Sequence, residues 1–193
     1  MSKANLLAAI AGTNRGILAT ETQNQTIQTA IAQLEAQTPT PRPLDHLDLL
    51  NGVWRLLYTT SAQLLGFEKW PFIQTGQIYQ CIQAESLTLY NIAELQGLPG
   101  LEAIVGVFAR LKPVSERRVE VRFERSITGL QRLLNYQSPQ TLVRQLDTQQ
   151  AVTALNIPLP TQRQTAWLET TYLDADLRIG RGSRDSVFVL SRV

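Results

Sequence analysis

The chain has one cysteine, Cys81, and one histidine, His46, among its 193 residues. A single cysteine excludes an intramolecular disulfide, and the two side chains together supply too few ligands for an ordinary zinc site. Such sparing use of cysteine is typical of a reducing compartment. We therefore expect neither a metal site nor a cofactor.

Excess charge of one sign and long apolar runs are also scarce. The chain has 18 Lys and Arg against 16 Asp and Glu, a net charge of +2, which is too balanced for the basic face that nucleic acid binding requires. No segment approaches the roughly 20 apolar residues of a membrane-spanning helix, so any contact with a membrane is expected at its surface. The N-terminal residues lack a signal-peptide core and cleavage site, and we interpret them as mature structure.

The common catalytic motifs are missing, including the nucleophile elbow, the phosphate-binding loop, the dinucleotide glycine pattern and the metalloprotease helix. His46 is more typical of a solvated residue at a helix start than of a general base. Asp174 and Asp176 could chelate a cation, but a turn between strands explains them better. Cys81 lies in an apolar segment and is expected to be buried and unreactive. We expect no catalytic residue.

The first part of the chain has a helical pattern. Apolar residues at helical spacing predict a short helix over 3–11 and an amphipathic helix over 21–37. The proline-rich segment 38–43 ends the second helix. This divides the chain into a helical head with its linker, residues 1–43, and a second domain, residues 44–193.

Beyond Val53 the apolar period changes from 3.6 to 2, which indicates β-strands. The clearest strand is 118–124, where apolar and charged residues alternate. The connections are too short for crossover helices, so we expect an antiparallel sheet closed into a barrel, which removes exposed edges. A short helix is expected around 142–146 and a loop over 156–160. The other expected strands are 53–60, 77–83, 86–95, 101–112, 165–172 and 185–192.

The sharpest local pattern is a glycine followed two residues later by a tryptophan. Gly52 permits a close turn at the start of a strand, and Trp54 can then plug the bottom of a barrel. By period 2, Leu56 and Tyr58 share the face of Trp54.

Three arginines near the C-terminus, Arg178, Arg181 and Arg184, are spaced three apart around two glycines. Arg178 or Arg181 could stack on the indole of Trp54 and close the barrel. Alternatively, the arginines and neighbouring backbone N–H groups could bind a phosphate. We favour barrel closure for Arg178 and leave anion binding open for Arg181 and Arg184.

Two segments carry a family resemblance. One is GVWRLLYTTS at 52–61, and the other is TTYLDADLRIGRG at 170–182, followed by VFVL at 187–190. Together with the middle segments at 76–80, 90–94 and 123–127, they resemble the plastid lipid-associated protein family, also called fibrillins. The likeness spans the barrel from about 44 to 193 and is expected to extend to the helical head. The family's Gly-x-Trp pattern matches Gly52 and Trp54, and its acidic–arginine ending matches Asp174 and Arg178.

The resemblance implies a lipocalin-like barrel that associates with thylakoid membranes or lipid globules and binds isoprenoid quinones, carotenoids or related lipids. The chain begins at the helical head without a Ser/Arg-rich transit peptide, so it resembles a cyanobacterial member. The expected location is then cytoplasmic and peripheral to the thylakoid membrane. The resemblance assigns no ligand contact.

The leading hypothesis is a non-enzymatic module that binds or presents an apolar small molecule inside the barrel. The alternative is a scaffold with no internal ligand, which coats lipid or binds a protein partner through the 21–37 helix or through loop 62–73, whose apolar stretch is 64–73. An isomerase or cyclase using Asp174 or Glu169 is the least favoured hypothesis. The expected cavity-lining residues are Trp54, Leu56, Tyr58, Tyr79, Tyr90, Ile92, Phe108, Phe123, Trp167 and Tyr172.

Overall fold

A computed structural model of the protein describes residues 2–61, 74–97, 99–148, 154–159 and 165–193. The apolar loop 64–73, a candidate lipid contact, lies outside these residues. Among the described residues, no helix is both long enough and apolar enough to traverse a bilayer.

The helical head forms as the sequence predicts. Helix α1 spans Lys3–Ile10 and helix α2 spans Glu21–Glu35. Thr20 and Gln23 form a reciprocal capping box that fixes the start of α2, because each side chain accepts a hydrogen bond from the other's backbone N–H. The apolar sides of both helices are buried against the outer face of the barrel.

The remainder of the chain is mainly one antiparallel sheet in the order β4-β3-β2-β1-β9-β8-β7-β5-β6. Because β4 also pairs with β5, the sheet closes on itself and leaves β6 outside the ring. This confirms the expected antiparallel, lipocalin-like β-barrel. The strands are β1 (Gly52–Thr59), β2 (Gln74–Gln83), β3 (Thr88–Gln96), β4 (Ala103–Pro113), β5 (Arg118–Leu130), β6 (Leu155–Pro158), β7 (Thr165–Leu173), β8 (Leu177–Gly182) and β9 (Ser186–Arg192).

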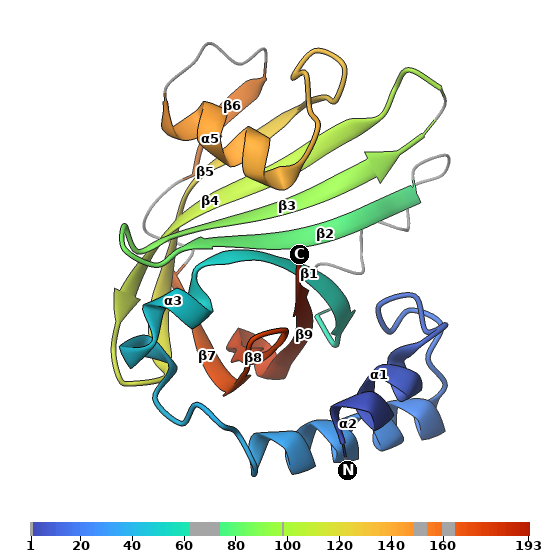
Figure 1. Ribbon diagram of the computed structural model, residues 1–193. Coiled ribbons are helices and arrows are strands. Elements are labelled where there is room, and N and C mark those ends of the chain that lie inside the picture. The colour runs from blue at the N-terminus through green and yellow to red at the C-terminus, as the bar shows by residue number, and fades with distance from the viewer. Residues whose placement is uncertain (1, 62–73, 98, 149–153, 160–164) are drawn as a thin grey trace.

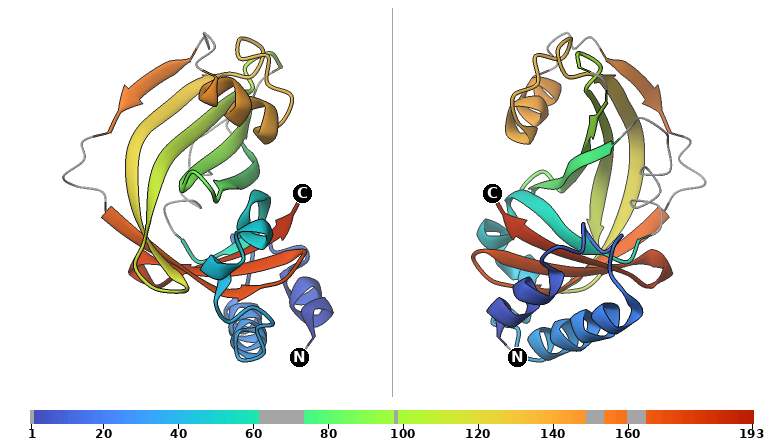
Figure 2. Two further views of the ribbon diagram at one scale, coloured as in Figure 1. Left: turned by 60° about the vertical axis from the view of Figure 1, so that its left-hand side comes forward. Right: turned by 90° about the vertical axis from the view of Figure 1, so that its right-hand side faces the viewer.

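The barrel lies between two helical layers (Figures 1 and 2). Helices α1 and α2 pack under β7, β8 and β9, and the one-residue register shifts in β1 and β7 turn Tyr58 and Tyr172 outward to meet them. On the other side, α5 (Pro139–Asp147) covers the outer face of β2, β3 and β4. The molecule therefore has an interior cluster and two outer apolar clusters.

One end of the barrel is closed by the segment between the head and β1. The 3₁₀ helix η1 (Pro43–Asp45) and the short helix α3 (Leu47–Leu50) lie across this end, which we call the floor (Figure 1). The N–H of Leu44 donates to the carbonyl of Glu116 in the β4–β5 hairpin at 3.1 Å. Leu44 and Leu49 pack against the interior cluster. The residues directly after the predicted linker thus close this end of the barrel.

Two segments differ from the prediction. Residues 177–182 form strand β8, which the sequence analysis does not predict because the glycines and arginines of this segment interrupt the apolar pattern. Residues 155–158 form β6 and not a loop; Pro158 is tolerated because β6 is an edge strand. The short helix expected around 142–146 is confirmed as α5, whose first turn is capped by Ser138.

Candidate functional site

The barrel interior is apolar and fully packed near the floor. Trp54 and Leu190 are fully buried there, and Leu56 is almost so. The indole N–H of Trp54 donates to the carbonyl of Leu50 at 2.9 Å, which fixes the ring over the end of α3. The tryptophan therefore plugs the barrel as the Gly-x-Trp pattern predicts.

Arg192 seals the floor from below. Its guanidinium lies 4.3 Å from the centre of the Trp54 ring and donates to the carbonyls of Ala175 (2.8 Å), Asn51 (2.7 Å) and Leu49. A side chain at Gly52, where φ is +131°, would place Cβ 2.8 Å from the Arg192 guanidinium. Sequence reasoning missed Arg192, although Phe188, Leu190 and Arg192 alternate along β9 toward the Trp54 face.

Arg178 lies on the inner face of β8 and is fully buried. Its guanidinium is 5.4 Å from the Trp54 ring centre, as the closure hypothesis expects, and donates to the side-chain oxygen of Gln80. Burial lowers the pKa of Arg178 to about 9, with a further contribution from the charge of Arg192. It remains a cation at neutral pH and ties β8 to β2 across the interior.

Arg181 and the two glycines expected at an anion site have structural roles. Arg181 binds the carboxylate of Glu35 with two hydrogen bonds, of 2.8 and 2.7 Å, and so holds α2 on the barrel. The glycines at 180 and 182 lie on the inner face of β8, where a Cβ would meet Leu168 or Phe188. They make space for interior side chains. Arg184 is exposed in the turn before β9.

Asp174 organises the β7–β8 turn. It accepts hydrogen bonds from Lys3 (2.8 Å), Tyr172 (2.7 Å) and two backbone N–H groups of the turn. Burial alone would raise the pKa of Asp174, but these hydrogen bonds outweigh it and lower the pKa. Within the described part of the chain, no group of acidic, histidine and cysteine side chains is arranged to hold a metal ion. Asp174 accepts from backbone N–H groups of the turn, as the turn interpretation expects, and through Lys3 it also attaches α1 to the turn.

Cys81 and His46 lie apart from each other, one on a strand and one before a short helix. Cys81 is buried on the outer face of β2, and this burial raises the pKa of its thiol to about 12. His46 stands between η1 and α3 as a flanking residue.

The ten expected lining residues do not share one cavity. Only Trp54, Leu56 and Phe123 belong to the interior cluster. The register shift after Leu56 breaks the period of 2 and turns Tyr58 outward, and β7 turns Tyr172 outward in the same way. The remaining residues face outward by alternation along their strands: Tyr79, Tyr90, Ile92 and Phe108 lie under α5, and Trp167 stacks against Arg118. Their role as ligand contacts remains a prediction.

The end of the barrel opposite the floor has an apolar inner surface that is partly open. Pairing places Val107, Ser126 and Ile157 in one row across β4, β5 and β6. The next row holds Val105, Thr128 and Leu155 in the same way. These rows face inward, as does Ala93, which pairs with Val105 and belongs to the interior cluster. We call Val105, Val107, Leu155 and Ile157 the inner wall.

The inner wall differs from the floor in exposure. Leu155 and Ile157 are 63% and 46% exposed, whereas Trp54 is 0% exposed. Phe123 and Phe188, at the same end as the wall, are half-buried against the interior cluster. Apolar side chains therefore run from the packed floor to an accessible surface.

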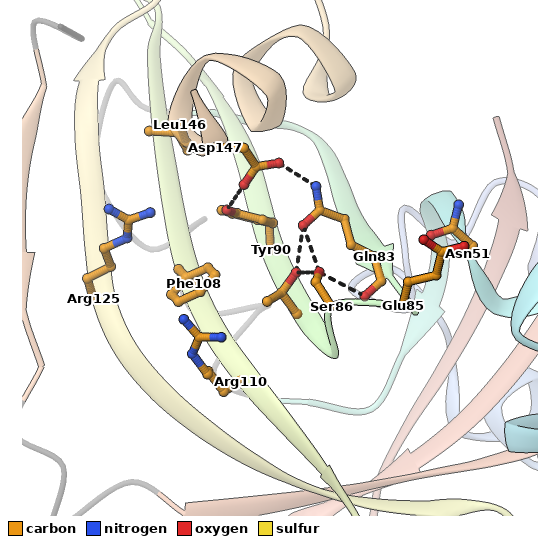
Figure 3. Close-up of a pocket in the computed structure, with 11 residues that line it drawn as sticks. Asn51, Gln83, Glu85, Ser86, Tyr90, Phe108, Arg110, Arg125, Leu146 and Asp147 are labelled. Atoms are coloured by element: carbon orange, nitrogen blue, oxygen red, sulfur yellow. Dashed lines mark hydrogen bonds between the residues drawn. The ribbon is translucent and has the colours of Figure 1, made fainter. Parts of the chain in front are cut away.

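A pocket lies on the opposite face of the same strands, between the C-terminal end of α5 and the β2–β3 hairpin (Figure 3). Its volume is about 660 Å³. Arg110 and Arg125 stand on either side of Phe108, and Asp147 reaches in from α5 (Figure 3). We call it the outer pocket.

A closed antiparallel barrel with an apolar interior and a tryptophan–arginine floor defines the class as a lipocalin-like barrel protein. Within that class the chain belongs to the PAP_fibrillin family, whose family model matches residues 1–191. No solved structure matches the chain.

Several plant plastid proteins are similar to the chain. It is 33% identical to the probable plastid-lipid-associated protein 2 of Arabidopsis thaliana, over 97% of the chain and 69% of that relative. It is 34% identical to plastoglobulin-1 of Pisum sativum, over 98% of the chain and 60% of that relative. It is 32% identical to the chromoplast-specific carotenoid-associated protein of Cucumis sativus, over 97% of the chain and 66% of that relative.

Proposed function

We propose that the protein binds or presents an apolar small molecule, with the inner wall as the contact surface at the open end of the barrel. The supporting observation is the exposure of apolar side chains at Leu155 and Ile157 on a face continuous with the buried interior. Covering such a surface releases water at a gain of about 25 cal/mol per Å². The floor is filled by side chains, so the ligand enters from the end opposite Trp54.

The names of the relatives support the ligand class. One relative is named carotenoid-associated and others are named lipid-associated. The proposed ligands are isoprenoid quinones, carotenoids or other lipids, met at a thylakoid membrane or lipid globule to which the protein is peripheral.

We infer that this binding involves no catalysis. The two acids considered as proton donors have structural contacts: Asp174 holds Lys3 at 2.8 Å, and Glu169 pairs with Arg118 at 2.7 Å. The hydrogen bonds of Asp174 lower its pKa, which makes it a poor proton donor at neutral pH.

Two neighbouring residues of β6 provide the test. Ile157 lies on the inner face and Asn156 on the outer face, and both are exposed, so Ile157→Asp and Asn156→Asp add the same charge at little cost to the fold. Each variant is titrated with a ubiquinone or plastoquinone analogue and with β-carotene, following quenching of tryptophan fluorescence. We expect Ile157→Asp to weaken binding by at least about tenfold, because it places a charge against an apolar ligand. Asn156→Asp should bind normally.

Equal binding by the two variants would exclude the inner wall as the contact surface. Lack of quenching in the unmodified protein, together with no lipid or pigment in organic extracts of the purified protein, would reject internal binding altogether. Flotation with lipid vesicles would then test the scaffold alternative directly.

A further inference from the structure

The outer pocket contains a cation whose hydrogen bonds are incomplete. Arg125 of β5 places its guanidinium 4.9 Å from the centre of the Phe108 ring. Its Nε–H is buried and has no hydrogen-bond partner, and among the described residues Arg125 forms no ion pair. The described protein therefore leaves part of this guanidinium without a hydrogen-bond acceptor.

A second guanidinium flanks the same ring. Arg110 of β4 lies 5.7 Å from the Phe108 ring centre, and its Nε donates to Glu124 at 3.1 Å. Within the described chain this is the hydrogen bond that Arg110 makes, so its terminal nitrogens remain available. Two guanidiniums around one aromatic ring form the positive end of the pocket (Figure 3).

The acidic groups of the pocket lie apart from this end or already have donors. Asp147 accepts the hydroxyl of Tyr90 at 2.6 Å with one oxygen and the amide of Gln83 with the other. Glu85 lies at the opposite end, beside Asn51 (Figure 3). An anion beside Arg125 would therefore meet Arg125 and Arg110, the latter already paired with Glu124 at 3.1 Å, and no carboxylate that lacks a donor.

The remaining lining suits a hydroxylated group. Ser86 and Thr88 bring hydroxyls, and Gln83 and Asn51 bring side-chain amides. The volume of about 660 Å³ is far larger than an inorganic oxyanion needs and lies in the range of pockets for small organic ligands.

We propose that the outer pocket binds the oxyanion of a small hydroxylated organic ester, as in the headgroup of an anionic lipid, with Arg125 and Arg110 holding the oxyanion. Arginine suits this role because its planar set of N–H donors matches phosphate and sulfonate oxygens. The site is distinct from the inner wall, because it occupies the other face of β4 and β5. It would hold the barrel against an anionic lipid surface while the inner wall meets the apolar molecule.

The test uses the full chain with two probes. Glycerol 3-phosphate is titrated by isothermal calorimetry, and flotation is measured with vesicles of phosphatidylglycerol mixed with phosphatidylcholine and with phosphatidylcholine alone. We expect the protein to bind glycerol 3-phosphate and the vesicles that contain phosphatidylglycerol, and not to bind vesicles of zwitterionic phosphatidylcholine alone. Arg125→Gln should weaken both interactions by at least about tenfold, as loss of a charged hydrogen bond does. Arg132→Gln, which removes the same charge from an exposed turn, should change them by less than about twofold.

The outcomes separate the sources of the oxyanion. Binding of both probes, with the expected loss, supports a lipid headgroup, whereas binding of glycerol 3-phosphate alone keeps the pocket and overturns its assignment to lipid. Binding of neither probe, or equal binding by Arg125→Gln and Arg132→Gln, overturns the proposal.

Two further variants control for misfolding of Arg125→Gln and for failure of the apolar site. If Arg125→Gln does not fold, as judged by circular dichroism, Arg110→Gln replaces it, because the Arg110 side chain is 60% exposed. Ile157→Asp should leave headgroup binding intact, so that failure of the apolar site and failure of the outer pocket can be told apart.

Discussion

Replacement of Arg192 by methionine should destabilise the barrel through its floor. The guanidinium makes three hydrogen bonds to carbonyl oxygens and lies 4.3 Å from the Trp54 ring centre, and methionine keeps only apolar contact with the ring. At about 0.5–1 kcal/mol for each hydrogen bond and about 1 kcal/mol for the cation–π contact, the expected loss is about 3 kcal/mol of unfolding free energy. The low value for hydrogen bonds reflects the solvent exposure of two of them.

The assay is urea unfolding followed by far-ultraviolet circular dichroism, which does not depend on the altered surroundings of Trp54. Arg184→Met removes the same charge from an exposed turn and should change stability by less than about 0.5 kcal/mol. Arg192→Lys should give an intermediate value, because an ammonium group can stack on the indole but cannot reach three separated carbonyls. A loss below about 1 kcal/mol in Arg192→Met would refute the view that Arg192 locks the floor.

Three other predictions concern the floor, the outer layer and the head. Gly52→Ala should lower the unfolding midpoint in urea, because φ is +131° and the new Cβ would crowd Arg192; an unchanged midpoint would contradict this. Leu142→Ala should cost about 2–5 kcal/mol, because this side chain of α5 is 1% exposed and packs against the outer face of the barrel; chemical denaturation measures the loss, and a loss under 1 kcal/mol would show that α5 is weakly packed. The pKa of Asp174 is lowered in the folded protein, so its stabilising effect is present above its ordinary value of 3.8 and is lost as pH falls through the folded value. The stability difference between wild type and Asp174→Asn should therefore shrink in acid, and a difference that is constant between about pH 6 and pH 3 would contradict this.

The fold was largely accessible from the sequence because its strands alternate and its head has helical spacing. The alternation of 118–124 correctly assigned Val121 to the interior, and the Gly-x-Trp pattern correctly placed Trp54 at the floor. Strand β8 was missed because Gly180 and Gly182, which look like turn residues, serve there as space for neighbouring side chains.

The site was less accessible, because faces depend on register. A strict period of 2 places Tyr58 inside the barrel, but one extra residue in β1 turns its side chain outward. No local sequence pattern predicts that register shift. Tyr90 and Phe108 were assigned to the interior because they are large and apolar, yet they belong to the layer under α5. The pairing of β5 with β6, which creates the inner wall, joins segments whose contact no local pattern encodes.

Because of the extra residue, β1 contacts both the barrel interior and the helical head. Before it, Leu56 packs with the core that rests on the floor; after it, Tyr58 anchors the head by donating to Asn24 of α2 at 2.9 Å. If β1 were regular with Leu57 retained, Leu56 and Tyr58 would point to the same face, and only one of the two attachments could form. The helical head is thus attached to the barrel wall through Tyr58, and removing the head should destabilise the barrel.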